Sequence, residues 1–269
     1  MDGFSKRLTR IMRPETGRSL VVAVDHGMAL GPLTGIKNIA EMITRLDATG
    51  LVDAWLLTKG IFRYAFEPLN NPGVILRISG GATIAGPELT REGQTATLDE
   101  ALAADADAVA TSAFIGSSYE HETLVALARA VSECRRWNMP LLGVVGLGKG
   151  NEDKKKDSRF IALGARVAAE HGADLVKAYY TEQDFDQVVA GCPVPVLIAG
   201  GPKCETDLDT LQMIHGAIDG GARGIVMGRN VWQSRHPEAL LAAVHGIIHL
   251  GLGVSEAADL LGEKINQRC

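Results

Sequence analysis

The sequence lacks the features of a membrane or secreted protein. The 269-residue chain contains no apolar run of membrane-spanning length, about 18 residues or more. Residues 1–14 carry charges throughout and contain no apolar stretch typical of a signal peptide. We therefore expect a cytoplasmic protein that has no membrane partner.

Paired cysteines and metal-ligand clusters are also missing. The four cysteines form no C-x-x-C pair, which indicates reduced thiols rather than a disulfide framework: Cys134, Cys192, Cys204 and Cys269. His245 and His249 lie one helical turn apart without an H-E-x-x-H pattern, and we expect them at the surface or an interface. No metal site is therefore predicted.

Concentrated positive charge is absent as well. The chain has 27 lysines and arginines against 32 aspartates and glutamates, so no broad basic surface attracts nucleic acid. The one basic run, residues 154–156, stands between Asp153 and Asp157 and predicts a solvated loop. The sequence contains neither a G-x-S-x-G nucleophile elbow nor a phosphate-binding P-loop.

What the sequence does contain is a succession of short apolar runs, each followed by a polar or glycine-rich turn. Several are continuous stretches of Val, Ile and Leu, as is typical of parallel strands buried on both faces. The eight runs are residues 20–24, 54–58, 74–78, 108–111, 141–145, 175–178, 194–199 and 224–227.

Helical patterns fill the intervals between these runs. Thr97 and Thr206 each precede an acidic residue by three positions, which is a capping-box signal for the start of a helix. Spacing of the apolar residues and Pro237 as a start signal predict helices over residues 119–137, 159–171, 237–251 and 255–265.

Eight strands joined by helical crossovers predict a closed (β/α)8 barrel, the TIM-barrel fold of the α/β class. The rival is a doubly wound open sheet, whose glycine fingerprint is absent after the first run. No linker divides the chain. We therefore expect one barrel domain over residues 1–269, with a lead-in at residues 1–18 and a C-terminal helix at residues 255–265.

In such a barrel the active site lies at the carboxyl ends of the strands, so polar residues at those ends are candidates. The first run is followed by Asp25-His26-Gly27. A carboxylate at that place points into the mouth of the barrel as an acid or base, although a tight turn would use the same residue.

A lysine inside the sixth run is the second candidate. Lys177 stands among apolar residues, and lysine is seldom buried without a reason. Burial disfavours the ammonium, and a neutral amine attacks a carbonyl to form an imine that promotes cleavage of the adjacent carbon–carbon bond. A structural ion pair at the rim is the alternative, and Lys59, Lys149 and Lys203 lie in loops and are weaker candidates.

Glycines after the last two runs form the third element. The seventh run ends in Ala199-Gly-Gly-Pro202 and the eighth in Met227-Gly-Arg-Asn230. Small residues let backbone N–H groups approach a phosphate, and Arg229 adds a charged fork. Because phosphate sites of barrels recur in these two loops, we expect phosphate here rather than plain tight turns.

Over nearly the whole chain, these residues resemble the DeoC/FbaB-type class I aldolases, and within them the branch of autoinducer-2-processing thiolases. The likeness is densest in residues 22–35, 177–180, 189–195, 199–201 and 227–234. It implies that the Schiff-base lysine is Lys177. It also implies an acid or base at Asp25 assisted by His26, and phosphate binding at Gly200, Gly201, Gly228 and Arg229.

The resemblance further implies catalysis without a bound cofactor and assembly into homo-oligomers, often decameric rings. One departure bears on the substrate. The fructose-bisphosphate aldolase branch carries a Trp-x-Tyr-Pro-Arg element whose tyrosine shuttles protons, and here that place reads Val144-Val-Gly-Leu-Gly-Lys149. The Gly148-Lys149 pair is similar to the thiolase branch, and Lys149 is a further candidate for contact with substrate phosphate.

Three hypotheses about function follow. In the leading one, a keto-sugar-like phosphorylated compound is cleaved with coenzyme A as co-substrate, giving acetyl-CoA and dihydroxyacetone phosphate. The nearest rival is an aldolase that joins dihydroxyacetone phosphate to an aldehyde. A non-catalytic phosphosugar-binding barrel is the third, and it would need neither Asp25 nor Lys177. Roles for Arg77, Glu120 and Tyr179 are left open.

Overall fold

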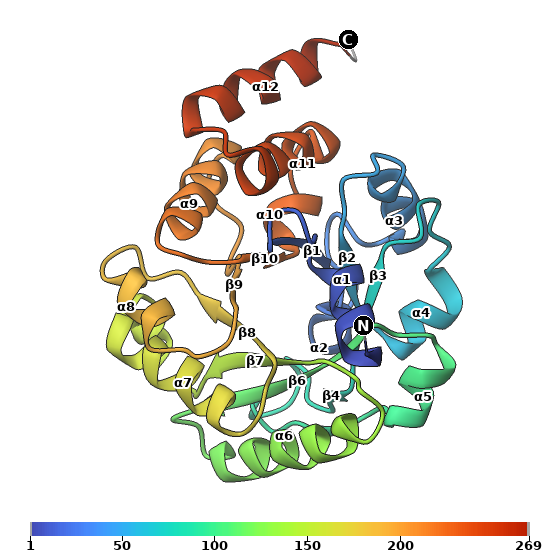
Figure 1. Ribbon diagram of the computed structural model, residues 1–269, viewed down its shortest axis with the longest axis vertical. Helices are drawn as coiled ribbons and strands as arrows, with labels where there is room; N and C mark the ends of the chain where they lie inside the picture. Colours follow the sequence, from blue (N-terminus) through green and yellow to red (C-terminus); the bar gives the residue numbers. More distant parts are fainter. Residues whose placement is uncertain (1, 268–269) are drawn as a thin grey trace.

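The protein is described from a computed structural model, which covers residues 2–267 (Figure 1). Eight parallel strands close into a barrel in the order β1-β10-β9-β8-β7-β6-β3-β2, with β2 pairing β1. The strands are β1 (Ser19–Ala23), β2 (Ala54–Thr58), β3 (Gly73–Arg77), β6 (Ala108–Ile115), β7 (Leu141–Leu147), β8 (Leu175–Tyr179), β9 (Val196–Ala199) and β10 (Gly224–Met227). Each expected run overlaps one of them, so the predicted (β/α)8 fold is confirmed.

Most of the helices surround the barrel in an outer layer (Figure 1). In chain order the helices are α1 (Gly3–Ile11), α2 (Gly27–Leu30), α3 (Ile39–Asp47), α4 (Lys59–Ala65), α5 (Leu98–Ala103), α6 (Glu120–Arg135), α7 (Ser158–Glu170), α8 (Phe185–Ala190), α9 (Asp207–Asp219), α10 (Arg229–Trp232), α11 (Pro237–His245), a π-helical turn η2 (Gly246–Leu250) and α12 (Val254–Asn266). The predicted capping boxes are present at Thr97 and Thr206 and begin α5 and α9.

The strands are continuous apolar runs because both of their faces are buried. In β1, Leu20 and Val22 pack outward against the helices, while Val21 belongs to a second cluster with interior residues of the other strands. Ile11 of α1 joins this interior cluster with no exposed surface. The barrel interior is therefore a packed core that α1 closes at the amino ends of the strands.

Three local features differ from the sequence-based expectation. A small antiparallel hairpin, β4 (Ser79–Gly80) with β5 (Gly93–Gln94), follows β3 and was not anticipated. Its strands have two residues each, too short for any periodic signal. The basic run expected as a solvated loop lies in a 3-10 helix, η1 (Glu152–Lys156), in which Lys154 and Lys155 are half-buried.

The prediction for His249 is wrong. Its side chain is 3% exposed, and its Nε2 lies 2.8 Å from Asp53 Oδ2 at the amino end of β2. Its Nδ1 lies 3.0 Å from Thr16 Oγ1. Periodicity placed His249 on an outer helix, but it could not reveal that the segment before Ser19 folds over this part of the helix and covers it.

The cysteines that the structure describes are free thiols, with Cys134 and Cys192 buried and Cys204 half-buried; Cys269 lies outside the described residues. Among residues 2–267, no helix combines the length and the apolar character needed to cross a membrane.

Candidate active site

The alternation of side chains along the strands places a polar layer directly above the interior core. Ile75, Ala110 and Leu175 belong to the interior cluster. Because side chains alternate with a period of two, the residues two positions further on, Arg77, Ser112 and Lys177, also point into the barrel. Asp25 follows Ala23 in the same way, just beyond β1. The four residues therefore converge at the carboxyl ends of β1, β3, β6 and β8.

Arg77 connects Asp25 and Glu92 within this layer. It is 5% exposed, and its Nη1 lies 3.4 Å from Asp25 Oδ2. Its Nη2 donates to both carboxylate oxygens of Glu92, at 3.1 and 2.9 Å. Glu92 immediately precedes β5, and its Oε2 also accepts from Ser79 Oγ at 2.8 Å. The short β4–β5 hairpin is thus tied to Asp25 through one buried guanidinium.

Burial and charge shift the pKa values of Lys177 and Asp25 in different ways. Burial lowers the pKa of Lys177, and the charges of Arg77 and Arg229 lower it further against the opposing effect of Asp25. For Asp25 burial is the largest influence and acts to raise the pKa, but the charges of Lys177 and Arg77 outweigh it and leave the pKa below its ordinary value. The site therefore favours an ionised carboxylate beside an amine that loses its proton easily.

His26 is a neutral imidazole at the wall of the same site. Burial lowers its pKa to about 4. The charge of Asp25 opposes this shift, and the charges of Lys177 and Arg229 add to it. Its Nδ1 lies 3.5 Å from Asp25 Oδ1 but makes no hydrogen bond to any residue that the structure describes. The ring packs edge-on against Trp232, with centroids 5.5 Å apart. His26 is therefore held by packing while a ring nitrogen stays available to a substrate.

The two glycine motifs are held together by Asn230, which sequence reasoning did not single out. Its Nδ2 donates to the carbonyl oxygens of Gly200 and Pro202, at 2.7 and 3.2 Å, and its Oδ1 accepts from Cys204 N at 2.7 Å. Gly201 adopts a φ of +63°, which favours glycine. The turn after β9 thus has a fixed shape, and its two glycines line a cavity.

Gly228 has a packing reason to be glycine in addition to any contact with phosphate. A Cβ there would lie 2.4 Å from His26 Cε1 and 2.5 Å from the carbonyl oxygen of Ala23. The next residue, Arg229, has a buried Nε without a partner among the described residues. An anion that enters between the two glycine motifs would satisfy this donor.

Six of the eight predicted residues line two adjoining cavities. One, which we call the lysine cavity, has a volume of about 610 Å³ and contains Asp25, His26, Lys149 and Lys177 in its wall. The other, the glycine cavity, is lined by Gly200 and Gly201. Tyr179 and Lys155 line both cavities and lie between them.

Gly228 and Arg229 line neither cavity. Arg229 is nevertheless close enough for its charge to lower the pKa values of His26 and Lys177, after the larger effect of burial. Glu120, whose role was left open, accepts a hydrogen bond from Gly116 N and so holds a loop.

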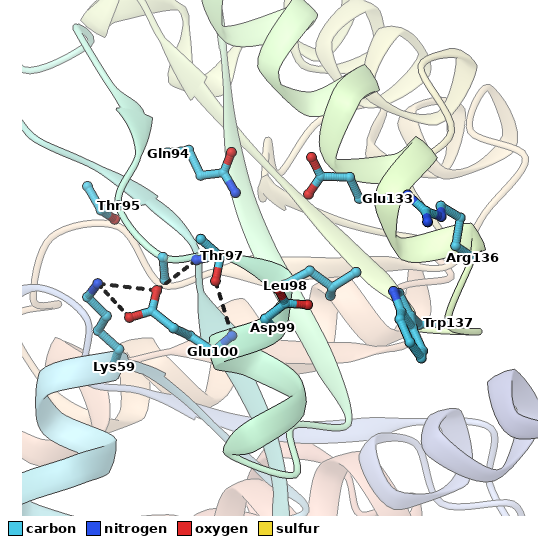
Figure 2. Close-up of a pocket in the computed structure, with 11 residues that line it drawn as sticks. Lys59, Gln94, Thr95, Thr97, Leu98, Asp99, Glu100, Glu133, Arg136 and Trp137 are labelled. Carbon is cyan, nitrogen blue, oxygen red and sulfur yellow. Dashed lines mark hydrogen bonds and ion pairs between the residues drawn. The ribbon is translucent and has the colours of Figure 1, made fainter.

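A third hollow lies outside the barrel mouth and contains none of the predicted site residues (Figure 2). It is formed by the segment around β5 and α5 together with the end of α6, where Trp137 lies. Lys59 in this hollow forms an ion pair with Glu100, with Nζ 2.9 Å from Oε1. Its amine is therefore already occupied, and the convergent chemistry is in the lysine cavity. Within residues 2–267 no group of three His, Cys, Asp or Glu side chains is arranged to hold a metal ion.

The stretch that lacks the shuttle tyrosine has a specific structure. Gly146 of β7 pairs with Phe114 of β6, and a Cβ at position 146 would lie 2.4 Å from the Phe114 ring. The space in which a side chain at 146 would begin is therefore filled by an apolar ring. Sequence reasoning noted the missing tyrosine but not Phe114, because their contact requires the register between two strands.

Comparison with known proteins identifies the family. The family model of the DeoC/LacD aldolases matches residues 19–234. The chain belongs to the DeoC/LacD family of aldolases. The match confirms the resemblance stated from the sequence, and the protein is an enzyme of the class I aldolase type.

Relatives in this family extend the match over almost the entire chain. The 3-hydroxy-5-phosphonooxypentane-2,4-dione thiolase of Escherichia coli K12 is 40% identical over 263 residues, which are 97% of this chain and 88% of the relative. The thiolase of that name from Photorhabdus laumondii has the same identity and coverage. An uncharacterised aldolase of Pasteurella multocida is 39% identical over 263 residues.

Solved structures of other aldolases are similar to this barrel. A Schiff-base-forming fructose-1,6-bisphosphate aldolase superposes with a TM-score of 0.83 and 28% identity, covering 91% of this chain and 100% of that one. An archaeal fructose-1,6-bisphosphate aldolase with its catalytic lysine bound to a carbinolamine intermediate gives a TM-score of 0.82 at the same identity, covering 91% of this chain and 99% of that one.

Proposed function

We propose that the protein is a thiolase that acts on 3-hydroxy-5-phosphonooxypentane-2,4-dione and releases dihydroxyacetone phosphate and acetyl-CoA. The observation that carries the proposal is the placement of Lys177 and Asp25 in one cavity, with the pKa of the amine lowered and the carboxylate ionised. The 40% identity to thiolases of that name over 97% of the chain supports the choice of substrate.

In this reaction the neutral amine of Lys177 adds to the keto group next to the phosphate-bearing carbon, and loss of water gives an iminium ion. The thiolate of coenzyme A adds to the acetyl carbonyl. The bond between the acetyl carbon and the hydroxyl-bearing carbon breaks, and its electron pair moves to the iminium nitrogen. The resulting enamine takes up a proton at carbon, and water then releases dihydroxyacetone phosphate from Lys177.

Asp25 is the group that moves protons at the reacting carbons, because it faces Lys177 and is ionised at neutral pH. His26 assists as a neutral base. The substrate phosphate binds between the two glycine motifs, at the backbone of Gly200, Gly201 and Gly228 and at the unpartnered Nε of Arg229. The lysine itself supplies the electron sink, so the proposed reaction uses coenzyme A as co-substrate and no bound cofactor.

A dihydroxyacetone-phosphate aldolase of the fructose-bisphosphate type is the second candidate, and the 28% identity to such enzymes of solved structure favours it. The Phe114 ring argues against this candidate. It fills the space in which a side chain at position 146 would begin, so no phenol at that position can carry protons. A homo-oligomer in the cytoplasm, in the form of a decameric ring, is part of the thiolase proposal.

Product analysis separates the two candidates. The protein is incubated with the phosphorylated dione, with and without coenzyme A, and acetyl-CoA and dihydroxyacetone phosphate are measured. The proposal predicts equal amounts of both products and cleavage that depends on the thiol. Fructose bisphosphate cleavage at a comparable rate without coenzyme A would contradict it and support the aldolase.

A further inference from the structure

The wall of the lysine cavity is divided between an apolar and a basic part. Its apolar part comprises Met28 and Leu30 of α2, Ile84 and Leu89 of the loop between β4 and β5, and Phe114 with Leu147. Ile84 and Leu89 are 62% and 42% exposed, so the apolar surface continues out to solvent. A lone surface leucine needs no explanation, but a contiguous apolar wall leading to a catalytic amine fits a ligand.

The loop that carries Ile84 and Leu89 is fixed in place. Ile84 N donates to the carbonyl oxygen of Ala29 at 3.0 Å, which joins the loop to α2. At the end of the loop, Glu92 is held by Arg77 through two hydrogen bonds. The apolar wall therefore has a defined shape, and a preformed shape lowers the entropic cost of binding a flexible chain.

Two lysines also line this cavity, Lys149 and Lys155, and we call the part of the wall that they form the rim. Neither forms an ion pair with a carboxylate whose side chain the structure describes. Lys155 Nζ lies 5.8 Å from the centroid of the Tyr179 ring, and Lys154 Nζ lies 5.0 Å from that of the Phe160 ring. Of the two glutamates in the cavity wall, Glu92 pairs with Arg77. Glu88 accepts from Thr90 Oγ1 at 2.6 Å, which lowers its pKa, and the charge of Lys149 lowers it further, so one carboxylate stands against two lysines. The rim thus offers positive charge to an anion.

The lysine cavity and the glycine cavity lie on two sides of Tyr179. When the substrate phosphate lies at the glycine motifs, the acetyl end of the substrate points into the lysine cavity, away from Arg229. The second substrate must therefore reach the acetyl carbon through the lysine cavity. Its body must suit an apolar wall and its far end must suit two lysines.

We infer that the lysine cavity is the entry for a long-armed thiol bearing phosphates, with the pantetheine arm of coenzyme A on Ile84, Leu89 and Phe114 and its phosphates on Lys149 and Lys155. This inference rests on the proposed function. At the inner end of the arm, the neutral His26 takes the proton of the thiol as the sulfur–carbon bond forms. Asp25, whose Oδ1 lies 3.5 Å from His26 Nδ1, then passes that proton to the enamine carbon.

Charge reversal at the rim tests the inference through the ratio of two thiols. Coenzyme A is compared with N-acetylcysteamine, which carries the reactive end of the arm and no phosphate. In Lys155→Glu and in Lys149→Glu, kcat/KM for coenzyme A should fall about tenfold relative to kcat/KM for the short thiol, because a charge-assisted hydrogen bond is lost. The loss should appear in KM rather than in kcat.

Lys154→Glu is the matched control, since it makes the same change of charge in the same 3-10 helix but does not line the lysine cavity. Its ratio of the two thiols should equal that of the unchanged protein. A thermal melt of each variant checks that the fold is retained. If Lys154→Glu lowers the ratio as much as Lys155→Glu does, or if neither rim variant lowers it, the inference is overturned.

Binding of coenzyme A that lacks its sulfur gives a readout independent of turnover. Calorimetry should detect binding to the unchanged protein and binding about tenfold weaker in Lys155→Glu. No binding to the unchanged protein would overturn the inference. The Schiff-base part of the proposed function is separate, because trapping of dihydroxyacetone phosphate on Lys177 needs no thiol and would fail only if that part is wrong.

Discussion

The two ends of the barrel each hold a buried aspartate, and the two sites are bonded very differently. At the amino end, Asp53 accepts on both oxygens, from Arg13 Nε at 2.5 Å, from Leu20 N at 2.6 Å and from His249 Nε2 at 2.8 Å. At the carboxyl end, Asp25 has Arg77 at 3.4 Å and His26 at 3.5 Å.

This difference indicates what each end is for. The donors around Asp53 fully engage its carboxylate, so that network stabilises the join between the lead-in segment, β1 and η2. Around Asp25, two buried nitrogens have no partner among the described residues, His26 Nδ1 and Arg229 Nε. Groups that are left underbonded at the mouth are ready for a substrate, and stability is lower there than it would otherwise be.

The amino end has one exception, His245, whose buried Nε2 also lacks a partner among residues 2–267. Its neighbour is the ring of His249, at 4.9 Å between centroids. Burial, followed by the charge of His249, lowers the pKa of His245 to about 4. His245 lines neither the lysine cavity nor the glycine cavity. It is therefore a half-buried neutral histidine away from the active site, comparable with His26 in its pKa.

The largest expected effect is on activity at the carboxyl end. Lys177→Met removes the amine that forms the imine, and turnover should fall by roughly 10⁴-fold or more. Since the variant also removes a buried charged group, its melting temperature should be equal to or above that of the unchanged protein. Steady-state kinetics and a thermal melt check the two expectations. Retention of more than a tenth of the activity would contradict the Schiff-base role.

Asp25→Asn should have the next largest effect. The amide keeps the shape of the side chain but cannot take up a proton, so kcat should fall by about 10³-fold. The free energy of unfolding should change little because Asp25 has only long contacts. Denaturant unfolding and kcat are measured on one preparation. Loss of stability with unchanged kcat would show that Asp25, like Asp53, stabilises the fold and takes no part in catalysis.

Asp53→Ala should reverse that pattern. It leaves Arg13 and His249 without their acceptor, and the free energy of unfolding should fall by about 3 kcal/mol. The folded fraction should keep its kcat, since Asp53 lies at the opposite end of the barrel from Lys177. Urea unfolding monitored by circular dichroism gives the stability. A kcat that falls in parallel with no change in stability would show that the two ends are not separate in role.

The two ends also share a dependence of stability on pH, which leaves activity at neutral pH unaffected. His26 and His245 each have a pKa of about 4 in the folded protein, because burial lowers it from the ordinary value of 6.5. Between these pH values the unfolded chain binds more protons, so the free energy of unfolding falls as the pH falls. For each histidine the loss is on the order of 3 kcal/mol at most.

His26→Asn and His245→Asn should each remove about half of this decline, and the double variant most of it. Urea unfolding at several pH values between 7 and 4 measures the slope. Only His26→Asn should also lower activity, which keeps the two ends distinct. An unchanged slope in both single variants would contradict the buried neutral state assigned to these rings.

The barrel could be predicted because parallel strands buried on both faces appear in the sequence as unbroken apolar runs. For the same reason Lys177 stood out, since an amine interrupts such a run. Glu92 could not be found in this way. It lies in a loop and gains its role only from a contact with Arg77, 15 residues earlier in the chain.

Other misses have similar causes. Phe114 and Gly146 are ordinary members of their strands, and only the β6–β7 register brings the ring over the glycine. Asn230 belongs to a motif noted for its glycine and arginine, but its three hydrogen bonds to the other glycine turn depend on the closure of the barrel. Two statements stay predictions. One is that the chain forms a single barrel domain, and the other is the set of roles given to the site residues.

Reductive trapping tests whether Lys177 forms an imine with the phosphoketone. The protein is incubated with dihydroxyacetone phosphate and borohydride, and the adduct is located by intact mass and peptide mapping. Our account predicts one stable adduct, on the peptide that contains Lys177, and none in Lys177→Met. An adduct on another lysine, or no adduct in folded protein that binds the phosphoketone, would contradict it.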